Sequence, residues 1–465
     1  MAAQRGIAGL PGLGLGAAAA AARGLAGSAV DLVRAESRAR ATLAGTEDFT
    51  YEPDEELTVT ADDGVALHVE IDHPAPGSPV PGSDPEAGGD EASGGLDEPI
   101  DPATRPTVVF THGYCLSLRS WAMQRRRMTE AGYRVVLWDH RGHGRSGRAP
   151  EESCQIDQLG RDLKAVIDAA APTGDLVLVG HSMGGMTIMA LAADFPEVVR
   201  ERVVAVAFVS TSAGGAQLIS LGFGEQFGKL LSRLGPGFLD RLGASERTLL
   251  RLRPFGRDVE DFFVEQLSFA SPVSRATVRF AGDLIFGTPF AVMSDFLDTL
   301  DRHDKLEALA TFHGVETLVI NGVQDILTPP EHSEEIVRRI PGAEHVVIND
   351  AGHLMMLEHG DLVAEQIVEL GERGMRARSA HVPVSDKPRV RRVVTNVAKR
   401  RRLERARRKA VDDARAKAQH ARADAAEAHR EGLASLKSSA RKRAPQKGAG
   451  AKAKAGSSRG AEKAS

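Results

Sequence analysis

Short runs of β-branched and other apolar residues alternate with longer amphipathic stretches along much of the chain. Apolar strands that are separated by helix-length segments are typical of a parallel sheet covered by helices on both faces. The alternation therefore predicts an α/β fold. The expected parallel strands are Thr107–Thr111, Tyr133–Trp138, Leu176–Val179, Val203–Val209, Thr317–Ile320 and His345–Ile348.

Two further patterns precede and interrupt these strands. Leu57–Thr60 and Val65–Ile71 alternate apolar and polar residues on either side of Asp63-Gly64, which predicts a β-hairpin. Residues 73–106 are rich in Pro, Gly, Ser, Asp and Glu, and we expect a solvated acidic loop there. Between Ser210 and about Ala310 the strand pattern disappears, and helical spacing predicts an inserted helical cap, in Phe227–Leu234, Val259–Phe269 and Phe290–Leu300.

The 465 residues therefore divide into a body with an insertion and two extensions, which the length allows. The expected parts are an Ala/Gly-rich N-terminal extension over 1–45, a first part of the body over 46–212, the cap over 213–310, a second part of the body over 311–375 and a basic tail over 376–465.

The formal net charge of −4 hides a strong asymmetry between the tail and the rest of the chain. Residues 387–465 hold 25 Lys/Arg against 7 Asp/Glu, whereas the other residues hold 34 against 56. Good helix formers over 398–431 predict a charged helix, and the polar residues after Gly432 predict disorder. We expect residues 387–465 to bind polyanions or anionic membrane surfaces; docking on the acidic body, or an effect on solubility alone, stays open.

The N-terminal stretch and the cysteines bear on location. Ile7–Ala22 is uncharged but has 16 residues, fewer than the ~20 that span a membrane, so a signal peptide, an anchor and a flexible extension all stay open. The two cysteines, Cys115 and Cys154, cannot build a disulfide framework. A cytoplasmic location fits best, with membrane association left open.

The most specific motif is Gly180-His181-Ser182-Met183-Gly184-Gly185, which stands between a predicted strand and a predicted helix. In a Gly-x-Ser-x-Gly elbow the glycines permit a tight turn that exposes the serine hydroxyl at the N-terminus of the helix. We therefore predict that Ser182 is a nucleophile. The alternative is a chance Gly-rich turn.

A serine hydroxyl needs a histidine base, and a carboxylate must orient that base. His353 follows the last predicted strand, and Asp325 lies in the loop after the preceding one, so the chain order is Ser, acid, His. His345 and His359 are rivals for the base but should lie in a strand and inside the final helix, respectively. We predict His353 as the base and Asp325 as the acid.

Acyl transfer also needs hydrogen-bond donors for the oxyanion. The backbone N–H of Met183 follows the nucleophile, and the loop after the first parallel strand offers the N–H of Tyr114. We predict these two donors. In the same loop His112 is expected to pack and hydrogen-bond in the turn, and Cys115 is expected to be a small buried apolar residue.

Four segments together resemble the α/β-hydrolase fold superfamily: Thr111-His112-Gly113, Asp139–Ser146, Gly180–Gly184 and Ala351-Gly352-His353. The pattern is similar to its serine esterase/lipase and cofactor-free haloperoxidase-like groups and covers about residues 55–372. The resemblance implies a mostly parallel, eight-stranded sheet flanked by helices, a cap, and a structural role for Asp139–Ser146. It also implies hydrolysis without a cofactor.

These features predict a serine hydrolase that cleaves carboxylic esters through an acyl-enzyme, with a small-molecule ester as its substrate. The Leu- and Phe-rich cap suggests a lipid-like or medium-chain acyl group. With no Cys/His cluster in the sequence, we expect no metal. A thioesterase, lactonase, perhydrolase or acyltransferase would use the same residues, and a non-catalytic protein that binds through its basic tail is a further alternative.

Overall fold

The computed structural model describes residues 48–74, 105–214, 260–380 and 390–405, and scattered helical positions between 408 and 419. Several predicted parts lie outside the described residues. These are the extension over 1–45, most of the acidic loop over 73–106, the cap stretch Phe227–Leu234 and most of the basic tail.

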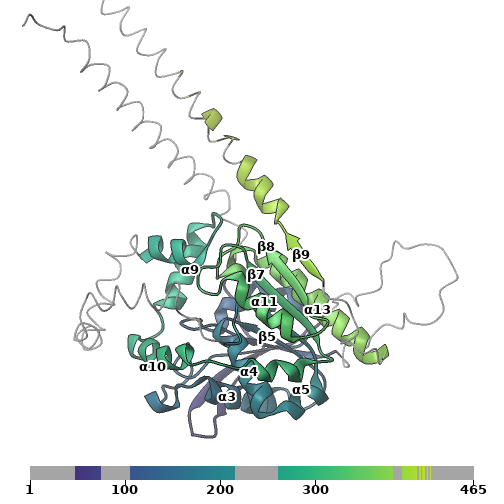
Figure 1. The fold of residues 1–465 in the computed structure, drawn as a ribbon. Helices are drawn as coiled ribbons and strands as arrows, with labels where there is room; N and C mark the ends of the chain where they lie inside the picture. The colour runs from purple at the N-terminus through teal and green to yellow at the C-terminus, as the bar shows by residue number, and fades with distance from the viewer. Residues whose placement is uncertain are drawn as a thin grey trace, which may run out of the picture. The chain divides into compact units, whose positions relative to one another are not determined.

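The body is built on one sheet with the strand order β1-β2-β4-β3-β5-β6-β7-β8-β9 (Figure 1). The predicted hairpin forms β1 and β2, and the pairs β1/β2 and β2/β4 are antiparallel. All other neighbouring strands are parallel, as the alternating pattern predicts. The strands are β1 (Glu55–Thr60), β2 (Ala66–Asp72), β3 (Thr107–Thr111), β4 (Val135–Trp138), β5 (Leu176–His181), β6 (Val203–Val209), β7 (Glu316–Gly322), β8 (Glu344–Ile348) and β9 (Arg391–Val394).

The sheet has nine strands rather than the eight expected, because β9 comes from residues that we assigned to the basic tail. Its arginines pair with carboxylates of the body: Arg392 lies 2.5 Å from Glu344, and Arg391 lies 3.2 Å from Glu334. The boundary at residue 376 is therefore wrong. The last long helix runs on to Ala380, and residues 390–405 pack as part of the body. We call residues 390–405 the C-terminal strap.

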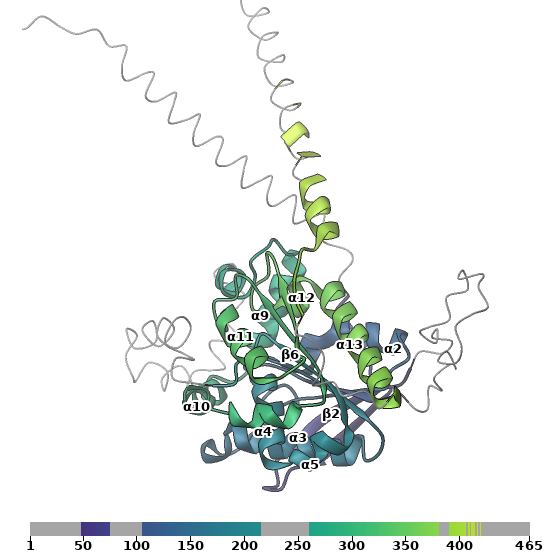
Figure 2. The ribbon, with the colours of Figure 1, turned by 45° about the vertical axis from the view of Figure 1, so that its right-hand side comes forward.

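Helices cover both faces of the sheet, as two views that differ by a rotation of 45° show (Figures 1 and 2). Alternate residues of β5 point to opposite faces: Leu178 joins the apolar cluster of α3 and α4, whereas Val177 and Val179 join that of α2 and α13. The helices and 3-10 turns of the body are η2 (Leu118–Trp121), α2 (Ala122–Glu130), η3 (Glu151–Ser153), α3 (Ile156–Ala170), α4 (Met183–Asp194), α5 (Pro196–Arg202), η4 (Glu307–Phe312), α11 (Pro330–Arg339), α12 (Met355–Glu358) and α13 (Gly360–Ala380).

The described part of the cap is helical over residues 260–268, α9 (Arg275–Ile285) and α10 (Phe290–Asp301). Phe280 of α9 is buried and stacks on Phe49, with the ring centroids 4.1 Å apart. Phe296 of α10 is completely buried in the body's core. Among the described residues no single helix is long and apolar enough to cross a membrane. The pair α9 and α10, with a bend of 82° between them, reaches the required length and apolar composition only when the two helices are taken together.

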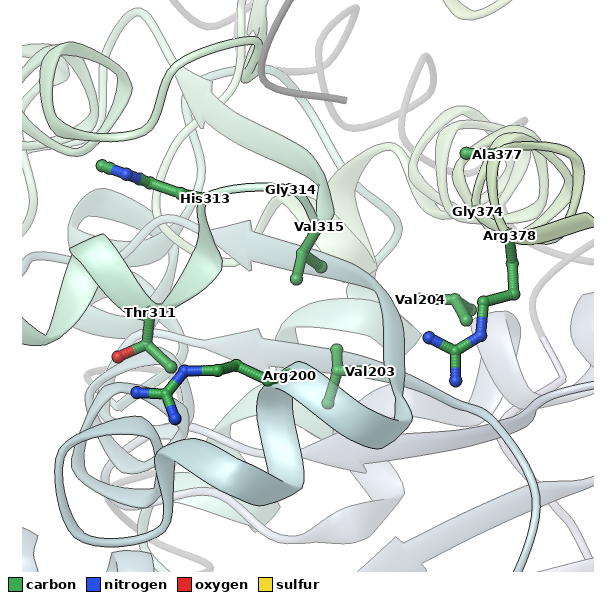
Figure 3. Close-up of a pocket in the computed structure, with 10 residues that line it drawn as sticks. All are labelled: Arg200, Val203, Val204, Thr311, His313, Gly314, Val315, Gly374, Ala377 and Arg378. Atoms are coloured by element: carbon green, nitrogen blue, oxygen red, sulfur yellow. The ribbon is translucent and has the colours of Figure 1, made fainter. Parts of the chain in front are cut away.

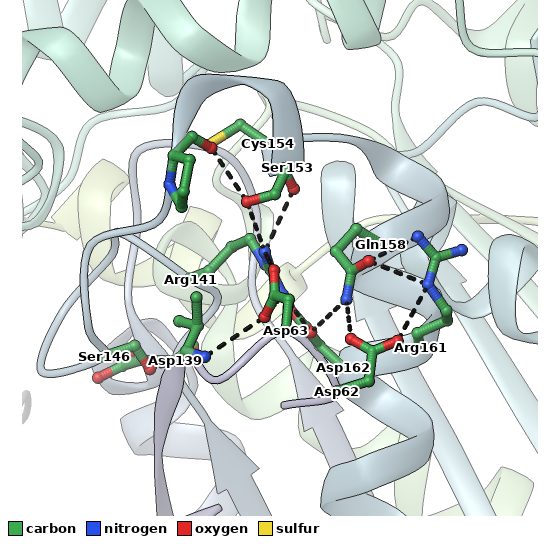
Figure 4. A network of polar contacts seen from close by, with 12 residues as sticks. Asp62, Asp63, Asp139, Arg141, Ser146, Ser153, Cys154, Gln158, Arg161 and Asp162 are labelled. Carbon is green, nitrogen blue, oxygen red and sulfur yellow. Dashed lines mark hydrogen bonds and ion pairs between the residues drawn. The ribbon is translucent and has the colours of Figure 1, made fainter. Parts of the chain in front are cut away.

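The loop Asp139–Ser146 is a structural junction (Figure 4). The Arg141 guanidinium binds Asp162 of α3 at 2.7 Å and Asp63 of the hairpin turn at 2.6 Å. The buried Asp139 carboxylate accepts hydrogen bonds from the backbone N–H groups of Leu118 and Arg145, both at 2.8 Å. These contacts join the hairpin, α3 and the loop before η2, which agrees with the structural role expected for this segment.

Buried imidazoles should make the fold sensitive to acid. Burial lowers the pKa of His140 to about 3, of His143 to about 4 and of His181 to about 3. In the unfolded chain a histidine has a pKa of about 6.5. Below that pH the unfolded state therefore binds more protons than the folded state, and each such histidine lowers the free energy of unfolding by ~1.4 kcal/mol per pH unit as the pH falls. Burial raises the pKa of Asp139 to about 6, which offsets about one histidine below pH 6.

Burial lowers the pKa of His303 and His359 to about 4 as well, so urea titrations should show that the free energy of unfolding falls by at least about 2 kcal/mol per pH unit between pH 6 and pH 5. A free energy of unfolding that stays constant between pH 7 and pH 5 would contradict the burial of these histidines in neutral form.

Candidate active site

Ser182 stands at a sharp turn between β5 and α4. Its φ of 50° and ψ of −119° lie in a region that L-residues rarely adopt, and such strain is often found at functional positions. The neighbouring glycines are required by close contacts. A Cβ atom on Gly184 would lie 2.2 Å from the Thr111 carbonyl oxygen, and one on Gly180 would lie 2.6 Å from the backbone of Gly184.

The turn is held by the neighbouring strands on both sides. The Ser182 N–H donates to the carbonyl of Val209 at the end of β6 (3.0 Å), and the Thr211 hydroxyl donates to the Ser182 carbonyl (2.6 Å). On the β3 side Gly113 packs closely, since a Cβ atom there would lie 3.2 Å from Ser182 Cβ. The loop after β3 therefore lies directly against the serine.

The structure brings His353 and Asp325 together. Asp325 follows β7, His353 follows β8, and His353 Nδ1 lies 3.1 and 3.0 Å from the two carboxylate oxygens. Thr328 also binds the Asp325 carboxylate: its N–H donates to Oδ1 (2.9 Å), and its hydroxyl donates to Oδ2 (2.8 Å). Burial alone would raise the pKa of Asp325, but the charge and hydrogen bonds of His353 and Thr328 outweigh it and lower the pKa to about 2.

His181 links this pair to the serine turn. Its Nε2–H donates to the His353 carbonyl (3.0 Å), and the two rings lie 4.8 Å apart. Because His181 precedes Ser182 directly, this contact brings the His353 loop to the serine turn. All three predicted residues follow the carboxyl ends of parallel strands, where α/β folds typically place their sites.

Of the two predicted oxyanion donors, Met183 follows the serine directly, and Tyr114 follows Gly113, which packs against the serine. Met183 is the first residue of α4, so no carbonyl four residues earlier within the helix accepts from its N–H. The turn that holds Tyr114 is closed by the Leu116 N–H to the Gly113 carbonyl (3.2 Å) and by the Cys115 N–H to His143 Nε2 (3.3 Å). Neither of these bonds uses the Tyr114 N–H.

Comparison with known proteins identifies the family. Residues 106–360, more than half of the chain, match the family model of the alpha/beta hydrolase fold. The chain belongs to the α/β-hydrolase fold family. The resemblance drawn from the four motif segments is thereby confirmed.

Curated relatives of this α/β-hydrolase include lipases. The sn-1-specific diacylglycerol lipase ABHD11 of Mus musculus is 30% identical over 262 residues, 54% of this chain and 76% of that protein. The monoacylglycerol lipase of Mycolicibacterium smegmatis is 30% identical over 140 residues, 30% of this chain and 48% of that protein. With such relatives, this α/β-hydrolase is an enzyme of the esterase and lipase type.

Two solved structures resemble the chain at low identity. An esterase from Exiguobacterium antarcticum covers 68% of this chain and 100% of its own, with a TM-score of 0.48 and 19% identity. A bromoperoxidase from Bacillus anthracis covers 68% of this chain and 99% of its own, with a TM-score of 0.48 and 21% identity.

The rival histidines of the α/β-hydrolase have structural partners. His345 lies in β8 and bonds Asn321 Oδ1 at 2.7 Å. His359 caps α12 rather than lying inside the final helix, and its Nε2 bonds the Asp350 carbonyl at 2.9 Å. His112 is fully buried and accepts from the His140 N–H at 3.0 Å, as its expected packing role requires. Cys115 is buried, and burial raises the pKa of its thiol, so its expected apolar role holds.

Sequence reasoning missed the roles of three residues around the predicted pair: Thr328, His181 and Glu358. Thr328 stands three residues after Asp325, a spacing typical of local side-chain to backbone turns, and could have been found. His181 is visible in the motif, but its contact with His353 is formed between distant strands. Glu358 has no local pattern at all, and its partners are described below.

One group of possible metal ligands occurs in the part of the chain that the structure describes. Ligand atoms of Glu56, His68 and Glu70 lie within 4.8 Å of one another. However, Glu56 is bound by both terminal nitrogens of Arg145 (2.7 and 2.8 Å), and Glu70 by Arg125 (2.6 Å). Because arginines already occupy the carboxylates, we interpret this group as an ion-pair cluster.

A pocket of about 370 Å³ lies away from the candidate residues (Figure 3). It sits at the amino ends of β6 and β7, the opposite edge of the sheet from Ser182. None of the predicted site residues is among its lining residues, which are Arg200, Val203, Val204, Thr311, His313, Gly314, Val315, Gly374, Ala377 and Arg378.

Proposed function

We propose that this α/β-hydrolase cleaves carboxylic esters through an acyl-enzyme on Ser182, with His353 as base and Asp325 as its orienting acid. The observation that carries the proposal is the buried Asp325–His353 pair beside a serine in a strained turn. A carboxylate fixed on Nδ1 holds the imidazole in one orientation and leaves Nε2 as the proton acceptor.

The chemistry proceeds in two halves. Ser182 Oγ attacks the ester carbonyl while its proton passes to His353 Nε2, and the N–H groups of Tyr114 and Met183 donate to the oxyanion. The imidazolium then gives its proton to the leaving alcohol, and the carbon–oxygen bond breaks to leave an acyl-serine. In the second half, water attacks this ester with His353 again as base, which releases the acid and frees Ser182.

We propose a lipid-like or medium-chain acyl group as the substrate class. Two observations support an apolar substrate: Phe262 and Phe263 of the cap are about half exposed, and the named relatives include lipases that act on acylglycerols. Large exposed aromatic residues are typical of surfaces that meet apolar partners.

A series of p-nitrophenyl esters from C2 to C16 tests this function. We expect kcat/KM to rise from the acetyl ester to a maximum at C8 or longer, because each buried CH₂ contributes ~0.8 kcal/mol. EDTA should not change the rate, since no step needs a metal. Thioesters, lactones and peroxide as the second nucleophile serve as comparison substrates. Faster turnover of one of these, with no ester hydrolysis, would favour the corresponding alternative activity.

The basic tail beyond the C-terminal strap is proposed to bind polyanions or anionic membrane surfaces. Residues 406–465 hold 16 Lys/Arg against six Asp/Glu and no aromatic residue, so contacts should be phosphate-directed and independent of sequence. We expect a chain truncated after Arg405 to keep full ester turnover and to lose binding to duplex DNA and anionic vesicles. The cut at residue 405 matters, because the strap belongs to the compact body.

The full-length chain should bind these probes at low salt and lose affinity steeply as salt rises. A full-length chain that binds neither probe at low salt would contradict the proposal.

A further inference from the structure

Three backbone contacts fix the loop that carries His353. The Gly352 N–H donates to Glu358 Oε2 (2.7 Å), and the Leu354 N–H donates to the Ser268 carbonyl (3.0 Å). Between them, the His353 carbonyl accepts from His181. The imidazole is therefore held from α12, from the cap and from β5, and a shift of any of these supports would move it.

Glu358 is the centre of this arrangement. Its other oxygen, Oε1, accepts from the Ala270 N–H (3.0 Å), from the Ser271 N–H and from the Ser271 hydroxyl (2.6 Å). The side chain is buried, and all of its partners are donors. A carboxylate satisfies donors on both oxygens, whereas an amide would turn an NH₂ group toward one of them. The Glu358 carboxylate thus ties Gly352, next to His353, to Ala270 and Ser271, which lie in the cap before α9.

The C-terminal strap completes the arrangement through Lys399. The Lys399 ammonium donates to the Ser271 hydroxyl and to the Glu358 carbonyl, each at 2.8 Å. The strap holds Lys399 in place at two points: β9 pairs with β8, and the Asn396 side chain accepts from the Lys399 N–H (2.9 Å) at the start of a helix. Although burial raises the pKa of Glu358, the charge of Lys399 acts against that shift.

We propose that Lys399 and Glu358 are positioning residues, and that the C-terminal strap thereby sets the placement of the catalytic histidine. This inference rests on the proposed function of His353. Neither residue would touch substrate. Their loss should lower kcat, because a misplaced base cannot take the serine proton, and it should leave KM nearly unchanged, because KM depends on the substrate pocket.

The test compares Lys399→Met with Arg400→Met. Arg400 is the next residue and is exposed, and among the described residues its one ion pair is with Glu404 in the same helix (3.3 Å), so it is a matched control. We expect Lys399→Met to lower kcat at least tenfold, and Glu358→Gln by up to about 100-fold, the size of loss that a 1 Å misplacement can cause. Arg400→Met should behave as wild type. The double variant Lys399→Met/Glu358→Gln should be no slower than Glu358→Gln, since both changes disrupt one arrangement.

Chemical rescue separates positioning from general damage to the fold. Lys399→Cys should lose activity, and alkylation with 2-bromoethylamine, which forms a carbon–sulfur bond and releases bromide, should restore most of it. Alkylation with iodoacetamide adds a neutral group and should restore nothing. The native Cys115 and Cys154 are buried, so wild type treated with either reagent is the control.

Hydrogen exchange of the peptide covering residues 350–358 gives a readout that does not depend on turnover. It should be faster in Lys399→Met than in Arg400→Met. The proposal is overturned if Lys399→Met keeps kcat within twofold of wild type, if KM rises while kcat stays, or if the exchange is unchanged. A wild-type chain without ester turnover would instead refute the proposed function, and the exchange comparison would still decide the role of Lys399.

Discussion

Replacing Ser182 with Ala should lower ester kcat by about 10⁴- to 10⁶-fold, the range found when the nucleophile of a serine hydrolase is removed. Without Oγ there is no acyl-enzyme, and only binding and the oxyanion donors can still act. The change removes one oxygen at the start of α4, and the backbone contacts that hold the turn do not involve that atom. The variant should therefore fold normally.

Ser120→Ala is the matched control. Ser182 is partly buried, whereas Ser120 is completely buried, and the Ser120 hydroxyl has no hydrogen-bond partner among the described residues. Steady-state kinetics on one chromogenic ester should show wild-type turnover for Ser120→Ala and none above background for Ser182→Ala. Equal rates in the two variants would mean that another residue carries the chemistry.

Asp325→Asn should lower kcat by about 10⁴-fold, although the side chain keeps its size. The asparagine can place an NH₂ group against His353 Nδ1, which favours the wrong tautomer and removes the proton acceptor at Nε2. In the wild type the N–H and the hydroxyl of Thr328 donate to the Asp325 carboxylate, and the asparagine should disturb these hydrogen bonds as well. Kinetics across pH 6–9 should show that the loss persists at every pH.

The effects should also be strongly non-additive, because the three residues act as a unit. Ser182→Ala/Asp325→Asn and Ser182→Ala/His353→Ala should be no slower than Ser182→Ala alone. If Asp325→Asn kept a tenth of the wild-type kcat, or if the losses multiplied in the double variants, Asp325 would not be the orienting acid.

Local patterns predicted the elements that carry the proposed chemistry. The β-branched runs gave β3 and β6 with their observed bounds, since a buried parallel strand must be apolar on both faces. The Ser, acid, His order then pointed to the loops after β5, β7 and β8, which the parallel topology brings to one edge of the sheet.

Long-range contacts explain what the sequence left out. Arg391–Val394 is short and half charged, and its arginines pair with carboxylates that lie far earlier in the chain, Arg392 with Glu344, 48 residues away, and Arg391 with Glu334. Glu358 and Lys399 both bind Ser271, which lies before α9. Hydrophobic periodicity does not predict such a contact between α12, the cap and the strap. From the count of Lys and Arg residues we assigned the strap to a separable basic tail. Such a count does not show which of these residues have partners in the body.

Labelling with a fluorophosphonate tests the central claim most directly, since such a reagent phosphonylates an activated serine with loss of fluoride. Peptide mapping by mass spectrometry should find one adduct per chain, on Ser182, formed in step with the loss of ester turnover. The adduct should be absent from Ser182→Ala and should form much more slowly in His353→Ala. An adduct on another residue, or full ester turnover with Ser182 unlabelled, would contradict the account.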